Sequence, residues 1–242
     1  MNKTFCKKKY LLILLFAGCL ILFNSGCGLD TFYVIDAPYV YHEPLYSSID
    51  HSESYFEFST VENRYEGIKF LGTEVYYKIY DSSSRLSSEY SNINAAATSE
   101  NATNQSADRM IETYKYQPLR SSDNPGANIL IPDTGDNRKV RIRLSNYNDV
   151  YEAEFTVAGT KLGIPVRSIS KNPVFSFKEL IGTDFLPKGG DNGDSDYSYT
   201  NTTGDISEYY VCMFAVAVAQ DVTYTRQYSN VVYLGSVTIP LE

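Results

Sequence analysis

The chain has 242 residues, a formal net charge of −8, 22 tyrosines and no tryptophan. So acidic a chain is not expected to have nucleic acid or anionic lipid as its main partner, because both would repel it. The length is enough for a sizeable hydrophobic core, since domains of about 100–150 residues are usual. Tyrosine fits half-buried pleated surfaces, so its abundance mainly indicates β-sheet, with a binding face as the alternative.

The N-terminal segment has the pattern of a secretory signal peptide. Four lysines and no acidic residue precede an uncharged apolar run from Leu11 to Phe23, and small or polar residues follow at 24–26. A basic start, an apolar stretch of about 7–15 residues and a small-residue exit describe such a signal. The run is short for a transmembrane helix, which needs about 20 apolar residues. We therefore expect the rest of the chain to be exported from the cytoplasm.

Two short motifs in this segment, "NSGC" ending at Cys27 and "FAGC" ending at Cys19, resemble the lipobox of bacterial lipoproteins. The resemblance implies that the cysteine thiol is acylated, that the signal is cut before it, and that the lipid holds the protein on a membrane. Cleavage before Cys27 uses the whole apolar run and begins the mature chain in polar residues. Residues 1–26 are therefore the expected signal peptide and Cys27 the expected lipidation site, with Cys19 as the alternative. An ordinary cleaved signal and an uncleaved anchor remain open.

Cleavage before Cys27 leaves residues 27–242 as the expected mature chain. The four lysines leave with the signal, so the net charge moves from −8 to −12. Acylation of Cys27 leaves Cys212 without a cysteine partner, so the core has to stabilise the exported fold without a disulfide. The residue after either cysteine is not aspartate. In the lipoprotein family such an aspartate retains the protein at the inner membrane, so the resemblance implies the outer membrane. It does not decide between the periplasmic face and the cell surface.

The first half of the mature chain carries three strand candidates, at 31–41, 54–62 and 72–81. Pro38 breaks the first of these segments. In the third, Val75, Tyr77 and Ile79 share one face and alternate with more polar neighbours. Such a period of two indicates a half-buried strand.

A segment rich in Ser, Asn, Ala and Thr follows and is predicted to be a helical insertion at 82–119. Four residues fall at helical spacing and indicate a short amphipathic helix: Leu86, Tyr90, Ile93 and Ala97. Ser106 is the expected N-cap of a second helix, which Pro118 bounds.

The clearest local pattern lies in the middle of the chain, in the strand candidates 138–145 and 151–158. Apolar residues alternate with basic ones in "KVRIRL" and with acidic ones in "YEAEFTV", which predicts an antiparallel hairpin. One register sets Arg143 opposite Glu152. The same register sets Arg141 opposite Glu154, and such pairs add roughly 0.2–1 kcal/mol each. The basic stripe is then half of a sheet surface and not a phosphate-binding track.

The last strand candidates, 208–220 and 228–239, follow a polar loop at 188–205. The first of these strands is apolar on both faces, so we expect it to be central and buried on both sides. The loop has carboxylates spaced as Ca²⁺ ligands, but it lacks the glycine of an EF-hand. A solvated loop is the prediction, and a Ca²⁺ site is the alternative.

The stretch "YYVCMFAV", from Tyr209 to Val216, resembles the sixth strand of fibronectin type III-like domains. "YSNVVYLGSV" is similar to the last strand of that family, and "TEVYYKIY" to the third. The resemblance implies an antiparallel β-sandwich over 27–242, interrupted by a long insertion with one or two short helices and the hairpin. It also implies that Tyr209 forms the tyrosine corner, and that the domain is a binding or spacer module.

The sequence offers no set of residues for catalysis or for a metal. The two histidines, His42 and His51, lack metal-ligand spacing, and no nucleophile stands in a recognisable motif with a base. We therefore expect no catalytic residue, metal or cofactor. The expected function is that of a membrane-anchored envelope module, which binds or adheres to another protein or to a host or envelope ligand. The alternative is a periplasm-facing structural or assembly lipoprotein that contacts another envelope protein through the helical insertion.

Overall fold

The computed structural model describes residues 33–45, 50–64, 66–98, 104–147, 150–169, 172–177, 186–200 and 206–241. The expected signal peptide at 1–26 and both candidate lipidation sites, Cys19 and Cys27, lie outside these residues. All that follows concerns the unit of the chain that begins at Tyr33.

The fold is mainly β with antiparallel sheets, as the sequence predicts. The strands are β1 (Tyr39–His42), β2 (Phe56–Ser59), β3 (Ile68–Tyr80), β4 (Gln117–Pro118), β5 (Arg120–Ser121), β6 (Ile131–Pro132), β7 (Lys139–Arg143), β8 (Glu154–Val157), β9 (Thr160–Lys161), β10 (Pro165–Val166), β11 (Tyr197–Ser198), β12 (Glu208–Asp221), β13 (Arg226–Tyr228) and β14 (Val232–Pro240). The helical elements are α2 (Ser83–Ala97), α3 (Gln105–Asp108) and the π-helical turn η1 (Arg109–Thr113).

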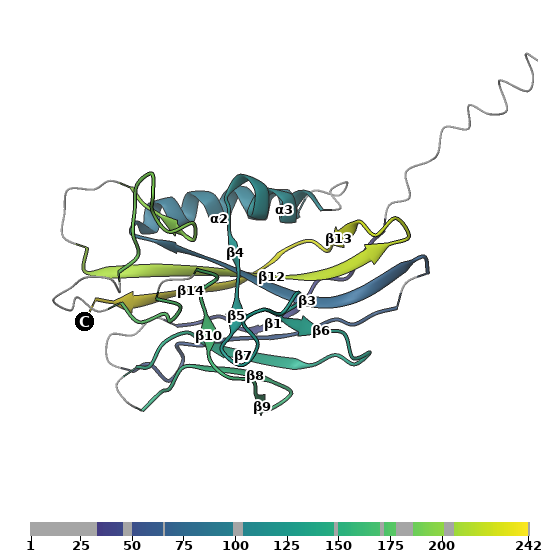
Figure 1. The fold of residues 1–242 in the computed structure, drawn as a ribbon, viewed down its shortest axis with the longest axis horizontal. Coiled ribbons are helices and arrows are strands. Elements are labelled where there is room, and N and C mark those ends of the chain that lie inside the picture. The colour runs from purple at the N-terminus through teal and green to yellow at the C-terminus, as the bar shows by residue number, and fades with distance from the viewer. Residues whose placement is uncertain are drawn as a thin grey trace, which may run out of the picture. The chain divides into compact units, whose positions relative to one another are not determined.

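Within the described residues the strands form two main sheets (Figure 1). The smaller sheet has five strands in the order β1-β2-β7-β8-β9, and β5 pairs separately with β10. The larger sheet has seven strands and is built on the long pair β3 and β12. β13 and β14 pair with the far side of β12, while β4, β6 and β11 pair with β3. β11 runs parallel to β3, and the other pairs are antiparallel.

The hydrophobic core lies between the two sheets. Alternate residues of the longer strands point inward, so each sheet supplies one apolar face to this core. The smaller sheet contributes Phe56, Phe58, Val140, Ile142 and Phe155. The larger sheet contributes Val75, Tyr77, Ile79, Val211 and Met213.

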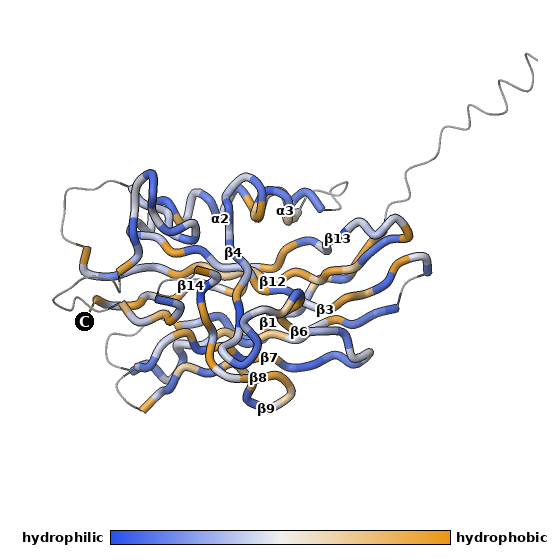
Figure 2. The backbone as a smooth tube through the Cα atoms, in the orientation of Figure 1, coloured by the Kyte–Doolittle hydropathy of each residue, from blue (hydrophilic) through white to orange (hydrophobic). Residues whose placement is uncertain are grey.

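The opposite face of the larger sheet is covered by the helices (Figure 1). Leu86 and Ile93 of α2 and Met110 of η1 pack there against Phe214 and Val216 of β12. β12 is therefore buried on both faces, which confirms the prediction of a central strand. Figure 2 shows the hydrophobic residues along β12 and the mostly hydrophilic course of α2.

The central hairpin forms, but the register predicted for it is wrong. β7 and β8 pair antiparallel with Arg143 opposite Glu154 and Arg141 opposite Thr156. The pairing is displaced by two residues from the predicted one. A displacement of two returns every side chain to the same face, so the apolar and charged faces are unchanged.

The helical segment begins as expected and continues differently. Ser82 caps α2 through its side chain, which accepts a hydrogen bond from the Arg85 backbone N–H. Ser106 was expected to cap the second helix, but it lies inside α3, whose N-cap is Asn104. The Ser106 side chain is buried and accepts a hydrogen bond from the Val231 N–H, so it ties the helix to the larger sheet.

Candidate functional site

A buried ion pair lies between the larger sheet and α2. β3 directs Lys78 toward the helices, where its ammonium lies 2.9 Å from Glu89 Oε2. The same ammonium donates to the backbone carbonyl of Tyr114 at 2.6 Å. Both charged side chains are 9% exposed. Burying two charges has a large desolvation cost, so such a pair persists only when its other hydrogen bonds are made.

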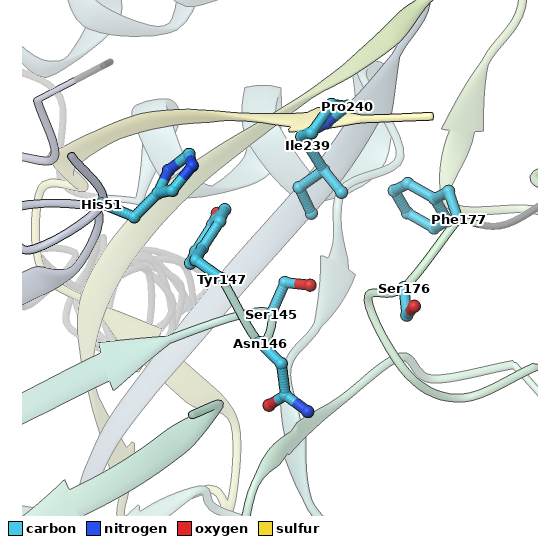
Figure 3. Close-up of a pocket in the computed structure, with 8 residues that line it drawn as sticks. All are labelled: His51, Ser145, Asn146, Tyr147, Ser176, Phe177, Ile239 and Pro240. Carbon is cyan, nitrogen blue, oxygen red and sulfur yellow. The ribbon is translucent and has the colours of Figure 1, made fainter. Parts of the chain in front are cut away.

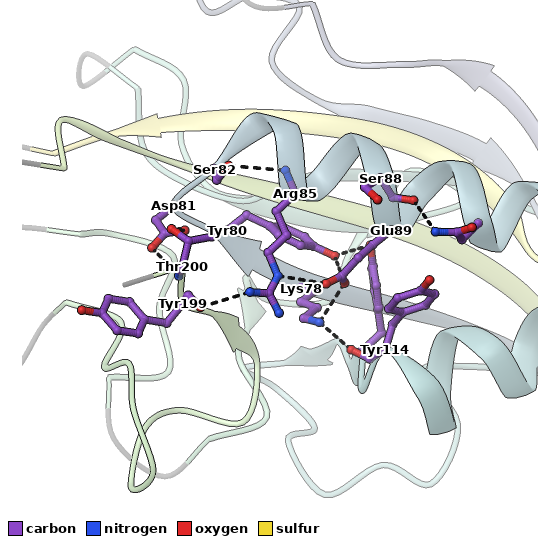
Figure 4. A network of polar contacts seen from close by, with 12 residues as sticks. Lys78, Tyr80, Asp81, Ser82, Arg85, Ser88, Glu89, Tyr114, Tyr199 and Thr200 are labelled. Carbon is purple, nitrogen blue, oxygen red and sulfur yellow. Dashed lines mark hydrogen bonds and ion pairs between the residues drawn. The ribbon is translucent and has the colours of Figure 1, made fainter. Parts of the chain in front are cut away.

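Tyrosines and an arginine complete this network (Figure 4). Glu89 also accepts from the Tyr80 hydroxyl at 2.8 Å and from Arg85 Nε at 3.2 Å. Tyr116 lies 2.8 Å from Tyr80, hydroxyl to hydroxyl. Burial lowers the pKa of Lys78, and the hydrogen bond that its ammonium donates to Glu89 opposes that shift, so the low-dielectric site and the carboxylate act in opposite directions.

A cleft of about 610 Å³ opens beside this network. Its walls come from β3, α2, the end of η1 and the segment 186–200. The cationic wall residues are Lys78, Arg85 and Lys115, and the aromatic ones are Tyr114, Tyr197 and Tyr199. Small-molecule sites typically measure about 300–1,000 Å³, so the cleft is of the size that holds a small ligand or part of a larger partner.

The backbone at the cleft wall is unusual. Residues Arg109–Thr113 form a π-helical turn, and Lys115 just beyond it has φ of 58°. π-turns and left-handed non-glycine residues are uncommon and are found often at functional sites. Nothing in the sequence around Lys115 signals either feature, because both depend on how the helical segment returns to β4.

The cleft is rich in hydrogen-bond donors. Among the described residues that line it, Glu89 is the acid, and its carboxylate is already shared by Lys78, Tyr80 and Arg85. Ser198, also on the wall, is 4% exposed and its hydroxyl has no hydrogen-bond partner in the described part of the chain. A buried hydroxyl without a partner is costly.

The basic stripe on the outer face of the smaller sheet has a different character, because its charges are paired. Lys139 lies 2.7 Å from Glu57, and Arg143 lies 3.6 Å from Glu154. The Arg141 guanidinium stacks 3.7 Å from the centre of the Tyr55 ring. This face is a neutralised sheet surface, as expected from the alternation of charges.

The carboxylates of the polar loop hold an arginine. Asp196 accepts two hydrogen bonds from Arg167, at 2.8 and 2.6 Å, and a third from the Tyr77 hydroxyl at 2.7 Å. Asp194 accepts from the same guanidinium at 2.9 Å. Among the residues described, no group of three His, Cys, Asp or Glu side chains is placed to hold a metal ion. Two of the carboxylates that suggested Ca²⁺, those of Asp194 and Asp196, are thus engaged with Arg167.

The two histidines lie apart from the cleft. His42 stacks on Tyr55 at 4.2 Å, and His51 stacks on Tyr147 at 4.5 Å, ring centre to ring centre. His51 and Tyr147 also border a cavity of about 30 Å³ (Figure 3). That volume holds about one water molecule, so the cavity is too small for an organic ligand.

Two further residues singled out by the sequence are buried. Tyr209 lies on the core face of β12, with its ring edge-on to Phe177 at 5.0 Å and to Tyr197 at 5.9 Å. Cys212 lies on the helix face of the same strand, where burial raises the pKa of its thiol to about 12. A thiol held in its protonated form is unreactive.

None of the helices in the described residues is both long and apolar enough to span a membrane. No protein-family model, no curated protein and no solved structure matches the chain significantly.

Proposed function

We propose that this chain is a non-catalytic binding module of the bacterial envelope, anchored by lipid at Cys27, whose cleft holds part of its partner. The observation that carries the binding role is the cleft itself. It combines ligand-like size, tyrosine walls, unpaired donor capacity and an uncommon backbone at Lys115. The anchor and the export rest on the signal pattern of residues 1–27.

The order of the strands supports a fibronectin type III-like module. Immunoglobulin-type sandwiches have strands A, B, E and D in one sheet and C, F and G in the other. The order β1-β2-β7 corresponds to A-B-E, and β3-β12-β14 corresponds to C-F-G. β8 follows β7 along the chain, whereas D precedes E in that family. In this proposal Tyr209 is the corner tyrosine, and 82–119 is inserted after the third strand.

The exposed face of α2 is a poorer candidate for the contact surface than the cleft. It is occupied mainly by small polar residues: Ser83, Ser84, Ser87, Ser88 and Ser91. Serine and alanine are depleted at protein interfaces, where aromatic residues and arginine are enriched. Beside its lysines and serines the cleft presents three tyrosines and Arg85, so we place the partner there and not on the outer side of the helix.

The anchor is tested by metabolic labelling with an alkyne fatty acid. We expect Cys27→Ala to abolish labelling and to leave an uncleaved precursor. The variant Cys19→Ala should be labelled and cleaved like the natural protein. If only Cys19→Ala loses the label, the lipidation site is Cys19. If the natural protein itself takes up no label, the lipid anchor is contradicted. Protease treatment of intact cells, with a periplasmic control, then separates the surface face from the periplasmic one.

The cleft is tested by site-specific photo-crosslinking in cells. We place a photoreactive phenylalanine analogue at Tyr199 in the cleft wall, and a matched one at Tyr224, which is 81% exposed on the turn between β12 and β13. We expect a discrete adduct, identified by mass spectrometry, at Tyr199 only. Equal adducts at both positions, or none at Tyr199, would contradict a binding role for the cleft.

A further inference from the structure

Building on the proposed function, we infer that the cleft recognises a monoanionic carboxylate group of its ligand. The donors that would contact it are the guanidinium of Arg85, the ammonium groups of Lys78 and Lys115, and the hydroxyl of Ser198. These side chains come from β3, α2, the segment after η1, and β11.

The first argument is the balance of donors and acceptors. Arg85 uses Nε for Glu89 and Nη1 for the Tyr199 carbonyl, and its side chain is 46% exposed. A guanidinium carries five N–H donors, so the remaining N–H groups of Arg85 can donate hydrogen bonds to a ligand in the cleft. Three strong acceptors on the wall, Glu89 and the carbonyls of Tyr114 and Tyr199, already receive hydrogen bonds. A ligand that supplies acceptors therefore fits better than one that supplies donors.

The second argument is the buried hydroxyl of Ser198. It is unpartnered within the described residues although it lies at the wall of an open cleft. Its oxygen is shielded from solvent in this structure, so an acceptor on a ligand would reach it only after a small movement of the cleft wall, and would then satisfy it. A carboxylate oxygen accepts such a hydrogen bond strongly because it is charged.

The third argument is the local charge, which favours one negative charge over two. Glu89 offsets one of the three wall cations. Glu112, 3.4 Å from Lys115, offsets a second. Asp81, which accepts from the Tyr197 hydroxyl at 3.1 Å, is a further acid behind the wall, so at most one positive charge remains, which suits a carboxylate better than a phosphate dianion. Arginine also presents a planar fork that suits the two oxygens of a carboxylate.

The rings of Tyr114, Tyr197 and Tyr199 complete the cleft and would contact the atoms that carry the carboxylate. Two sources share this chemistry: a free small carboxylic acid and the C-terminal carboxylate of a protein chain. Tyrosine walls accommodate a side chain or a ring next to the carboxylate in either case.

The test compares ligands that differ only in the carboxylate. Full-length protein in detergent micelles is titrated with N-acetyl-tyrosine and with N-acetyl-tyrosinamide, followed by ligand-observed NMR. We expect the acid to bind at least tenfold more tightly than the amide, and inorganic phosphate to bind more weakly than the acid. A tetra-alanine peptide then distinguishes the two sources. A cleft that binds a protein C-terminus should bind the peptide with a free C-terminus more tightly than the small acid, and the amidated peptide more weakly than the free one.

Two variants and a matched control tie the preference to the cleft. We expect Arg85→Gln to abolish the preference for the acid, and Ser198→Ala to weaken the acid several-fold without lowering thermal stability. Arg109→Gln removes an exposed arginine outside the cleft and is expected to leave the preference unchanged. Thermal unfolding of each variant verifies that it is folded.

The inference is overturned if acid and amide bind alike or not at all, if phosphate binds more tightly, or if the preference survives in Arg85→Gln. These outcomes are separable from failure of the proposed function. A specific adduct at Tyr199 without a carboxylate preference would keep the binding role and remove the ligand class. No adduct at Tyr199 together with a preference that depends on Arg85 would keep an anion site and remove the partner.

Discussion

Glu62 shows how much a single buried acid organises in this fold. Its side chain is fully buried and accepts from the backbone N–H groups of Thr134 and Gly135, at 2.7 and 2.9 Å. The guanidinium of Arg138 donates to its other oxygen at 2.7 Å. Burial alone would raise the pKa of Glu62, but these donors outweigh it and hold the pKa below its ordinary value.

Replacement of this carboxylate should therefore destabilise the protein. We expect Glu62→Gln to lower the free energy of unfolding by about 3 kcal/mol, since one amide oxygen cannot serve all the donors and Arg138 loses its partner. Because the folded pKa is lowered, the carboxylate's contribution is present above pH about 4.5 and is lost as the pH falls through the folded pKa. Urea unfolding at several pH values measures both effects.

The more weakly paired Glu57→Gln serves as the control for Glu62 and should cost less than about 1 kcal/mol. Equal losses in the two variants at neutral pH would contradict the account of Glu62.

Glu74 on β3 shows the opposite balance. It is 1% exposed and its nearest cation, Arg120, lies 3.2 Å away. Burial raises the pKa of Glu74 to about 7, and Arg120 only partly opposes this shift. A raised folded pKa means that the folded chain binds the proton more tightly than the unfolded one. Stability is therefore expected to fall as the pH rises from about 4.5 to about 7.

Glu74→Gln should remove this pH dependence. The amide resembles the protonated acid, so the variant is expected to gain stability relative to the natural protein between pH 4.5 and 8, by on the order of 3 kcal/mol. Parallel curves of unfolding free energy against pH for the two proteins would show that Glu74 does not titrate in this range.

At the scale of elements, the hairpin shows what alternation specifies and what it leaves open. Alternation assigns each residue of β7 and β8 to a face. A displacement of two residues keeps every face, so the pattern alone does not select between Glu152 and Glu154 as the partner of Arg143. In the observed register Glu152 lies near Lys161 of β9, and Glu57 of β2 pairs with Lys139.

Double-mutant cycles on one arginine test this register. We expect Arg143→Gln and Glu154→Gln to be coupled by about 0.5 kcal/mol in urea unfolding, because the two residues are directly opposite. Arg143→Gln and Glu152→Gln should be additive within about 0.3 kcal/mol. The reverse pattern would restore the register that the charge pattern first suggested.

At the scale of the whole molecule, the segment 82–119 is part of the core. It supplies Leu86, Ile93 and Met110 to the face of the larger sheet, and it ends in β4, which pairs with β3. Without it, Phe214 and its apolar neighbours on β12 would face water. The segment is an insertion by position along the chain, but its apolar residues are needed to cover the larger sheet.

Deletion of 82–119 is therefore expected to abolish folding. Loss of partner binding in the deleted protein would then not show that this segment contacts the partner. We expect the deleted protein to be insoluble or to bind a hydrophobic dye strongly, while a variant with Ser87→Ala and Ser88→Ala, on the exposed face of α2, stays folded. A soluble deletion variant with native near-ultraviolet circular dichroism would contradict this role.

The sequence by itself determined the mainly β character, the position of the strands of four or more residues and the central place of β12. These properties follow from the spacing of apolar residues along one segment, because a residue's face depends only on its position in the strand. The burial of β12 on both sides is predicted from its sequence alone, because both of its faces are apolar.

Only the tertiary structure decided the strand register, the partners of the buried charges and the cleft. The cleft joins Lys78 and Arg85 to Lys115 and Ser198, which lie about 30 and 113 residues further along the chain, and none of the four stands in a motif with another. Asp194 and Asp196 have the spacing of Ca²⁺ ligands, but both accept hydrogen bonds from Arg167. The physical reason is the same in each case: a charge is stabilised by the neighbour that packing brings within about 3 Å, and local spacing carries no record of that neighbour.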